Sequence, residues 1–400
     1  MNNFIPVASD FISSTEIDSI IQQNQFYLDR LECKRISPDK LKFTSPLYYF
    51  VVTGGTEQQI LILHAERKNK FPNEEIILLA HPGNNSLPAC LEVLARFIQE
   101  GKKGKIIYLP DLKIPFKESQ KINIQKITDS KTLKSCRIGL VGEPSDWLVA
   151  SSPSPQIVKK QWGADVIPIK LDELKKQISS IEPEDTTIIK SDLIEKADRI
   201  IEPSDKEIAD NVRVYLAMKK LVKKYQLDAV TLRCFNLILD LKTTGCFALS
   251  KLNDEGIIAG CEGDLVSTLG MLWTYRKTGR IPWMANPARI NRNENKLWLA
   301  HCTVPRCLVN SYKLRSHFES GLGVGIQGVF PKGKVTLLRI GGKNLDRIWR
   351  AEGEIVQIGR EENLCRTQVK IKLSENADVQ DILINPLGNH LVMLEGKKLI

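Results

Sequence analysis

Short runs of β-branched and other apolar residues alternate with helical patterns through the first part of the chain. The runs are YYFVVTG from Tyr48, EIILLAH from Glu75, KIIYLP from Lys105 and RIGLVG from Arg137. Between the second and third runs, Leu91–Gln99 has the apolar spacing of a helix. Strands that alternate with helices are typical of a parallel sheet covered by helices. The sequence therefore predicts an N-terminal α/β domain over residues 1–165.

A second α/β unit follows. Ser204 and Glu207 form a capping-box pattern, which predicts a helix that continues to about Tyr225. The run DAVTLRC, at Asp228–Cys234, is expected to be the next strand. We assign residues 166–290 to this second α/β domain.

The pattern changes after that point to short alternating runs separated by glycine, proline and asparagine. These runs are NKLWLAHC, KVTLLRIGG, EGEIVQIG, CRTQVKIKL and NHLVMLEG. They predict a C-terminal antiparallel β domain, barrel-like in form, over residues 291–400. The expected fold is thus α/β, with two Rossmann-like domains followed by a β domain.

Composition narrows the range of partners and compartments. The chain has 57 basic and 47 acidic residues and a net charge of +10, but it contains no recognisable nucleic-acid module. An anionic small molecule stays open as a ligand. No apolar run approaches the roughly 20 residues of a membrane helix, and the N-terminus lacks the plan of a signal peptide. Nine cysteines without a C-x-x-C pair indicate reduced thiols. We expect a cytoplasmic protein with no nucleic-acid or membrane partner.

The segment from Gly260 to Pro287 reads GCEGDLVSTLGMLWTYRKTGRIPWMANP and places two carboxylates before an apolar helical run. A helix N-terminus favours negative charge, so a helix cap accounts for either Glu262 or Asp264. A cap does not account for the loop-like run CFALSKLNDEGIIAG before the segment. Nor does it account for Asn286 in MANP, 24 positions after Glu262 (286 − 262).

Few histidines are available for chemistry: His64, His81, His301, His317 and His390. His81 ends a strand, where the ligand crevices of parallel sheets lie, so a pocket role and a structural role are equally open. His301 and His317 flank β segments rich in arginine, which could hold an anionic substrate or form surface ion pairs. His64 is interpreted as structural, and His390 lies on a turn before the last strand.

A family resemblance appears in the same segment. The order Glu262-x-Asp264, Met271-Leu272, Lys277-Thr278-Gly279 and Met284-Ala285-Asn286 resembles the metal-binding segment of the L-fucose isomerase family, and the GNH that contains His390 resembles that family's C-terminal metal histidine. HPGNNSLPACLEVLA, PSDWL and RIGG resemble other parts of the fucose and arabinose isomerases. The resemblance runs through most of the chain, which would be a compact relative because the full-length family is longer.

The resemblance implies aldose–ketose isomerisation on a divalent metal, usually Mn²⁺, with Glu262, Asn286 and His390 as the metal ligands. Such a metal would bridge two neighbouring sugar oxygens and stabilise an enediolate formed by a catalytic base. Asn286 stands where the family has an aspartate, and an amide brings neither charge nor basicity. Asp264 is the nearest substitute acid.

The resemblance also leads to roles for other residues. Glu262, Asp264 and His301 form the predicted catalytic set, with Glu262 as candidate base and His301 as proton carrier or polar pocket group. The predicted substrate-binding residues are His81, Arg306, His317 and Arg366. The expected substrate is a small sugar, and the resemblance implies a homo-oligomer.

Two other function classes stay open. A non-catalytic sugar-binding protein with a degenerate metal site is supported by Asn286. A dinucleotide-dependent oxidoreductase would need a phosphate-binding glycine turn between a strand and a helix, which HPGNNSLPA matches poorly. Gly323-Val-Gly325-Ile-Gln-Gly328 matches G-x-G-x-x-G, but the strand-like KVTLLRI follows it. We interpret this segment as a glycine-rich β connection.

Overall fold

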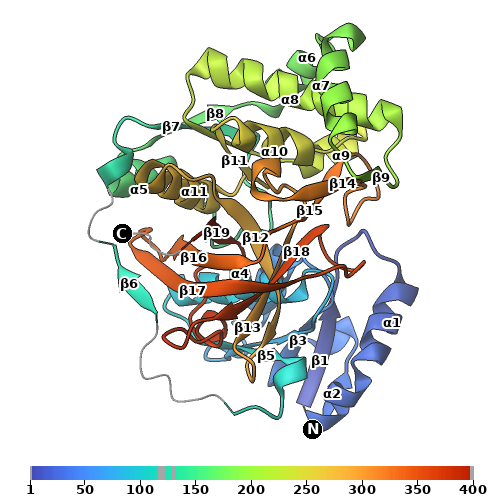
Figure 1. Ribbon diagram of the computed structural model, residues 1–400. Coiled ribbons are helices and arrows are strands. Elements are labelled where there is room, and N and C mark those ends of the chain that lie inside the picture. Colours follow the sequence, from blue (N-terminus) through green and yellow to red (C-terminus); the bar gives the residue numbers. More distant parts are fainter. Residues whose placement is uncertain (1, 116–122, 128–130, 397–400) are drawn as a thin grey trace.

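Two parallel sheets, one small sheet and one antiparallel barrel make up the computed structural model, which describes residues 2–115, 123–127 and 131–396 (Figure 1). The first parallel sheet lies behind the barrel and to its lower right in Figure 1, with α1 and α2 at the lower right, and the second parallel sheet lies above the barrel. None of the described helices is long and apolar enough to cross a membrane.

The first sheet is parallel throughout and has the strand order β2-β1-β3-β4-β5. Its strands are β1 (Asn2–Val7), β2 (Cys33–Arg35), β3 (Leu47–Val51), β4 (Ile76–Ala80) and β5 (Gly104–Tyr108). Its helices are α1 (Ser14–Gln23), α2 (Gln25–Arg30), α3 (Glu57–Arg67) and α4 (Ser86–Gln99). Every residue of β4 is buried, as expected for a central parallel strand with covered faces. The order reverses at β1, and ligands of open α/β sheets bind beside such a reversal.

The second sheet is also parallel and has the order β11-β10-β7-β8. Its strands are β7 (Arg137–Val141), β8 (Asp165–Ile169), β10 (Ala229–Leu232) and β11 (Ile258–Cys261). The helices of this part are α5 (Pro155–Trp162), α6 (Leu171–Ser179), α7 (Pro183–Glu195), α8 (Asp205–Tyr225), α9 (Phe235–Leu241), α10 (Cys246–Asp254) and α11 (Leu265–Thr278). The predicted capping box of Ser204 and Glu207 is confirmed at the start of α8.

Two local expectations were wrong in this part of the chain. The RIGLVG strand, grouped by sequence with the first sheet, is β7 of the second sheet. The loop-like run CFALSKLND forms α10, because its apolar residues Phe247, Ala248, Leu249 and Leu252 are buried in the core. Asn253 donates to the carbonyls of Leu249 and Ala259 and accepts from the N–H of Ala259, which ties the helix end to β11.

Six antiparallel strands close into a barrel in the order β16-β19-β12-β13-β18-β17, with β17 paired back to β16. They are β12 (Trp283–Asn291), β13 (Lys296–His301), β16 (Gly333–Gly341), β17 (Arg347–Ile358), β18 (Thr367–Leu373) and β19 (Leu391–Glu395). The short strand β6 (Ile124–Lys126) pairs with β17 from outside, and α12 (Asp381–Ile384) precedes β19. The α/β class and the C-terminal barrel are confirmed, whereas the Rossmann-like character of both α/β parts and the domain boundaries stay predictions.

A separate small sheet joins β9 (Arg199–Ile200), β14 (Ser311–Arg315) and β15 (Gly325–Val329). The last two glycines of the G-x-G-x-x-G match lie in β15, so the interpretation as a β connection is confirmed. Short 3-10 turns occur at η1 (Pro38–Lys40), η2 (Leu109–Asp111), η3 (Lys131–Leu133) and η4 (Arg306–Leu308).

The first sheet, the second sheet and the barrel meet at the carboxylate of Glu92 on α4. This buried carboxylate accepts hydrogen bonds from the N–H of Ala150, the hydroxyl of Ser151 and the N–H of Asn389, at 2.7–2.9 Å. Ala150 and Ser151 follow β7, and Asn389 precedes β19. One buried group therefore fixes the relative positions of the three parts that surround the site.

Candidate active site

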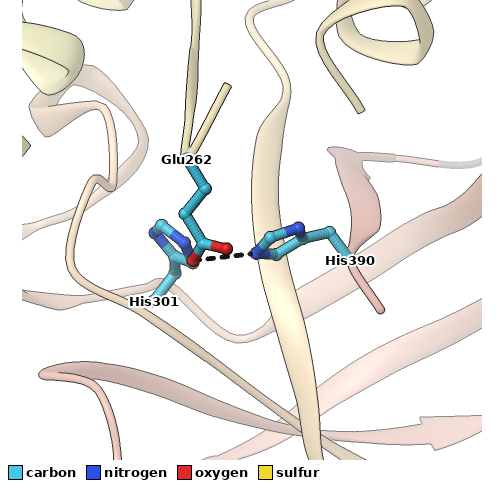
Figure 2. A group of neighbouring side chains, drawn as sticks. All are labelled: Glu262, His301 and His390. Carbon is cyan, nitrogen blue, oxygen red and sulfur yellow. Dashed lines mark ion pairs between the residues drawn. The ribbon is translucent and has the colours of Figure 1, made fainter. Parts of the chain in front are cut away.

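Glu262 lies in a strained turn between β11 and α11. It has a φ of +63°, and Gly263 after it has a φ of +72°. A left-handed residue other than glycine costs roughly 1–2 kcal/mol, so it persists only where surrounding contacts hold it. Here the carbonyl of Glu262 accepts from the N–H of Ser145 at 2.9 Å. The turn projects the Glu262 side chain from the end of the second sheet toward the barrel (Figure 2).

Gly263→Ala should destabilise the protein more than Gly279→Ala, its matched control. Both glycines have a φ near +70°, but a Cβ at Gly263 would lie 2.8 Å from the Glu143 oxygen and the Pro144 Cα, whereas Gly279 has open space. We expect a loss of roughly 1–2 kcal/mol at Gly279, and about 1–3 kcal/mol more at Gly263 for the clash. Urea unfolding of both variants measures the difference, and equal losses would contradict this account of the turn.

Glu262, His301 and His390 form a cluster of three potential metal ligands (Figure 2). One ligand atom from each residue lies within 4.8 Å of the others. The Nε2 of His390 is 3.5 Å from an Oε1 of Glu262, and the two imidazole rings are 5.5 Å apart. His301 ends β13 and His390 immediately precedes β19, so both imidazoles come from the barrel. One carboxylate and two imidazoles are compatible with a divalent metal.

Asp264 orients the ring of His390. Its carboxylate lies 2.9 Å from the Nδ1 of His390 and accepts from the backbone N–H of Ser267 at 2.7 Å. Because a carboxylate only accepts, Nδ1 carries a hydrogen and Nε2 faces Glu262. Burial alone would lower the pKa of His390, but the charges of Glu262 and Asp264 raise it to about 9. Without a cation, the imidazole is therefore protonated and pairs with Glu262.

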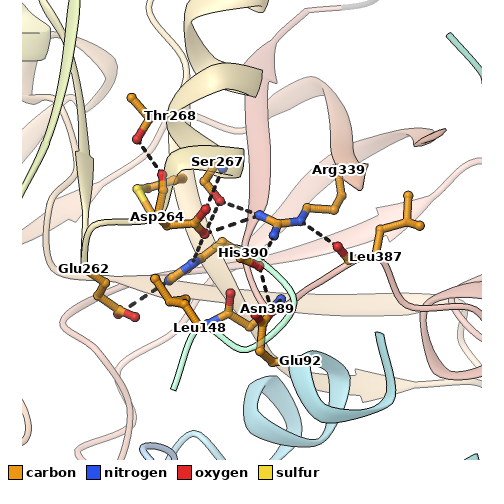
Figure 3. Close-up of polar contacts among 12 residues, drawn as sticks. Glu92, Leu148, Glu262, Asp264, Ser267, Thr268, Arg339, Leu387, Asn389 and His390 are labelled. Carbon is orange, nitrogen blue, oxygen red and sulfur yellow. Dashed lines mark hydrogen bonds and ion pairs between the residues drawn. The ribbon is translucent and has the colours of Figure 1, made fainter. Parts of the chain in front are cut away.

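Behind His390, Asp264 belongs to a buried polar network (Figure 3). Burial would raise the pKa of Asp264, but the guanidinium of Arg339 and the ring of His390 hold it well below its usual range. Arg339 is 2% exposed and donates to the hydroxyls of Ser267 and Ser151, each at 2.5 Å. The expected helix cap is confirmed for Asp264, the N-cap of α11. Its carboxylate contacts His390 and does not line the cavity described next.

A cavity of about 610 Å³ opens beside the cluster. This volume is in the range of roughly 300–1,000 Å³ that is typical of small-ligand sites. Glu262, Asn286 and Asn389 line one part of it, and the residues after β1, β3 and β4 line another. The aromatic lining residues are Phe11, Trp147, Phe235 and Phe318. The carboxyl edge of the first sheet and Glu262 of the metal-ligand cluster thus share one cavity, whereas His301 and His390 are not among its lining residues.

Asn286 lies on β12, between the two strands that carry the histidines. The register pairs Ala285 with Leu391, and Asn286 and His390 are the next residues of the two segments. Asn286 also pairs with Ala300, the residue before His301. Its Oδ1 is buried and has no hydrogen-bond partner within the described residues. An unpartnered buried acceptor costs about 1–3 kcal/mol, which a bound cation would offset.

Trp147 is a site residue to which the sequence analysis gave no role. Its indole N–H donates to an Oε2 of Glu262 at 2.6 Å and its ring packs on Phe235. Burial would raise the pKa of Glu262, but the positive charge of His390 lowers it, so Glu262 is a carboxylate. The signal for Trp147 was present in PSDWL, one of the motifs that carried the family resemblance.

His301 is neutral in this arrangement. Burial, followed by the charge of His390, lowers its pKa to about 3. Its Nδ1 lies 2.9 Å from the hydroxyl of Thr303. A neutral imidazole has a lone pair for a metal, so His301 fits the ligand set better than the proton-carrier role assigned to it from sequence. That role stays a prediction.

The structure does not bring the predicted substrate-binding residues to the cavity wall. The ring of His81 lies 2.8 Å from the carbonyl of Val52, and burial lowers its pKa to about 4. Arg306 forms an ion pair with Asp254 at 3.0 Å. His317 is not among the residues that line the cavity.

Two further contacts describe the surroundings of His317 and Arg366. The ring of His317 packs at 5.6 Å on Phe235, which lines the cavity. Arg366 donates to the carbonyl of Ser316 at 2.8 Å and pairs with Glu362 at 3.1 Å. Direct substrate contact by any of the four residues stays a prediction.

Comparison with known proteins gives distant relatives and no match to a family model. The chain is 24% identical over 278 residues to a sulfoquinovose isomerase of Alkalicoccus urumqiensis. The aligned region covers 66% of this chain and 61% of the relative. Sulfoquinovose isomerases of Priestia aryabhattai and Priestia megaterium are 22% identical over 270 residues, covering 64% of this chain and 58% of each relative. The chain therefore spans less than two thirds of the length of these relatives. They relate it to sugar isomerases but leave membership of the L-fucose isomerase family a prediction.

Among solved structures, a glucose-galactose binding protein of Geobacillus stearothermophilus is 11% identical with a TM-score of 0.20, covering 69% of this chain and 91% of that protein. A similarity this low supports no conclusion about fold or function.

Proposed function

We propose that this protein is a metal-dependent sugar isomerase that interconverts an aldose and a ketose through an enediolate. The observation that carries the proposal is the cluster of Glu262, His301 and His390 beside a cavity of about 610 Å³. The similarity to sulfoquinovose isomerases supports the same class of reaction. Sulfoquinovose carries a sulfonate, and the sugar used by this protein is a separate question.

The residues present fit a divalent cation. Oδ1 of Asn286 is buried and has no hydrogen-bond partner within the described residues, and Nε2 of His390 has only its ion pair with Glu262 at 3.5 Å, as expected for atoms that face a ligand. Glu262, His301, His390 and Asn286 would hold the cation. Two oxygen and two imidazole donors suit Mn²⁺, one of several metals that accept such a set. A bound cation supplies Lewis acidity toward two neighbouring sugar oxygens.

The protein's own part in the reaction is to move one proton between neighbouring carbons. In the aldose, the carboxylate of Glu262 takes the proton from C2, which gives the enediolate. The proton of the C2 hydroxyl passes to the oxygen at C1, and the carboxyl returns its own proton to C1, which gives the ketose. The hydrogen bond from Trp147 to Oε2 holds the Glu262 carboxylate in place during both transfers.

A second candidate function is sugar binding without turnover, favoured by one observation. Asn286 provides a neutral amide where a second acidic ligand would strengthen the site. The isomerase would show metal-dependent turnover, and the sugar-binding protein would not. The homo-oligomer expected from the sequence is compatible with both functions.

Metal removal tests the proposal directly. Protein stripped with a chelator should lose turnover on a panel of aldoses and regain it with Mn²⁺. In calorimetry, Asn286→Asp should bind Mn²⁺ more tightly than the wild type, on the order of tenfold, because affinity rises with the charge of the ligand set. Turnover that persists in metal-free protein would contradict the proposal, and so would the absence of Mn²⁺ binding to both proteins.

A further inference from the structure

Several acceptor atoms of the cavity wall lack hydrogen-bond partners within the described residues. They are Oε2 of Glu57, Oδ1 of Asn85, Oδ1 of Asn286 and Oδ1 of Asn389. Asn286 and Asn389 lie beside His390, whereas Glu57 begins α3 after β3, and Asn85 precedes α4 after β4. The carboxyl edge of the first sheet therefore contributes its own unpartnered polar atoms to the cavity.

Glu57 is 2% exposed. Burial raises its pKa well above the ordinary value; the backbone N–H groups of Glu57 and Thr56 oppose the shift, and the charges of Glu92 and Glu262 add to it. Its Oε2 can accept a hydrogen bond from a ligand hydroxyl. No other group within the described residues uses its Oε2.

Asn85 is held in place by a second acid. Its φ is +56°, and its side-chain NH₂ donates to an Oε1 of Glu319 at 2.9 Å, which leaves its Oδ1 for another donor. Although Glu319 is exposed as a residue, loss of solvent around its carboxyl raises its pKa to about 7. Asn85 thus presents an oriented acceptor, with an acidic group behind it.

No cation among the described residues lines this cavity, although the chain as a whole has a net charge of +10. The ionisable lining residues are Asp10, Glu16, Glu57, Glu262 and Glu319. The first turn of α1, which could otherwise attract an anion, is already capped by Ser13 and Glu16. The first turn of α4 includes Pro88, which has no N–H.

We infer that Glu57 and Asn85 form a second subsite, which binds hydroxyl groups of an uncharged sugar and rejects sugars that carry a sulfonate or phosphate. The inference rests on the proposed function and adds the class of substrate. One sugar hydroxyl can donate to the Glu57 carboxyl and another to the Asn85 oxygen. A sulfonate offers only acceptors, so it cannot bond to these two oxygens, and it would lose its hydration beside the carboxylates of the cavity.

The test measures binding to the full, Mn²⁺-loaded chain by calorimetry. The probes are the uncharged aldoses D-glucose, D-mannose, L-fucose and L-arabinose, together with sulfoquinovose and glucose 6-phosphate. We expect the best uncharged sugar to bind at least tenfold more tightly than either anionic sugar. Equal or tighter binding of an anionic sugar would overturn the inference.

Substitution of Glu57 gives the residue-level test. Glu57→Met removes the acceptor oxygen and should weaken sugar binding by about tenfold, the effect of roughly one lost hydrogen bond. Glu57→Gln keeps an acceptor oxygen and should stay within about threefold of the wild type. Both variants should keep the Mn²⁺ affinity within about twofold, and Glu57→Met should not lower the melting temperature, since it removes a buried unpartnered oxygen. Unchanged sugar binding in Glu57→Met would overturn the assignment.

The outcomes separate this inference from the proposed function. Selective binding of an uncharged sugar without turnover contradicts the isomerase and leaves the subsite standing. Metal-dependent turnover of sulfoquinovose, at least as efficient as that of the uncharged sugars, supports the isomerase and contradicts the subsite. If no sugar binds, both are wrong.

Discussion

Glu262→Gln is expected to lower turnover by about 10³-fold or more while the protein stays folded. The change removes a charged metal ligand and the proposed base together, and a general base alone contributes roughly 10²–10⁴-fold. The fold should survive because a glutamine oxygen can still accept from the indole of Trp147, the partner of Glu262 at 2.6 Å. Glutamine also meets the same backbone constraint at a φ of +63°.

The measurements are the isomerisation rate, Mn²⁺ affinity and melting temperature of the variant. Glu173→Gln is the matched control: it removes the charge that pairs with Lys224 away from the cavity, and should leave the rate near the wild-type value. Near wild-type turnover by Glu262→Gln with its metal bound would remove Glu262 from the mechanism. A large loss of stability would instead mark Glu262 as structural.

The sequence predicted the parts of the site that depend on local pattern. A helix cap was recognisable at either Glu262 or Asp264 because capping residues stand just before an apolar helical run, and the structure assigns it to Asp264. Glu262 and His390 came from a motif resemblance, and the structure places them 3.5 Å apart although 128 positions separate them (390 − 262). The barrel strands were visible because alternation along a strand reports its burial.

The remaining parts depend on strand pairing, which one sequence does not encode locally. The pairing of β13 and β19 with the two edges of β12 brings the end of β13, at His301, and the start of β19, next to His390, to the same level of the barrel. The distance between His301 and His390 in the chain gives no indication of this. Likewise, β7 was grouped with the wrong sheet because a buried parallel strand looks alike in either sheet. Glu57 ends the turn TGGTE, for which no role was predicted, because its burial depends on packing between distant parts of the chain.

Asp264→Asn is expected to lower both the free energy of unfolding and the affinity for Mn²⁺. The Asp264 carboxylate accepts from Nδ1 of His390, from two groups of Ser267 and from Arg339 at 3.4 Å. An amide offers one oxygen, and its NH₂ would face one of these donors. Breaking a buried ion pair costs about 3–5 kcal/mol, and we expect about 3 kcal/mol because Glu92 still lies near Arg339.

The same substitution should weaken Mn²⁺ binding by about 10–100-fold, because Asp264 sets the tautomer of His390. Facing an amide NH₂, Nδ1 of His390 would become the acceptor and Nε2 would carry the hydrogen, which removes the lone pair that the metal needs. Asp146→Asn is the control, since it breaks an ion pair with Arg233 in which Asp146 is 75% exposed, and such pairs contribute less than about 1 kcal/mol. Urea unfolding and Mn²⁺ calorimetry on both variants check the two effects separately. If Asp264→Asn lost stability but kept its Mn²⁺ affinity, Asp264 would be a helix cap and ion-pair partner with no influence on the metal site.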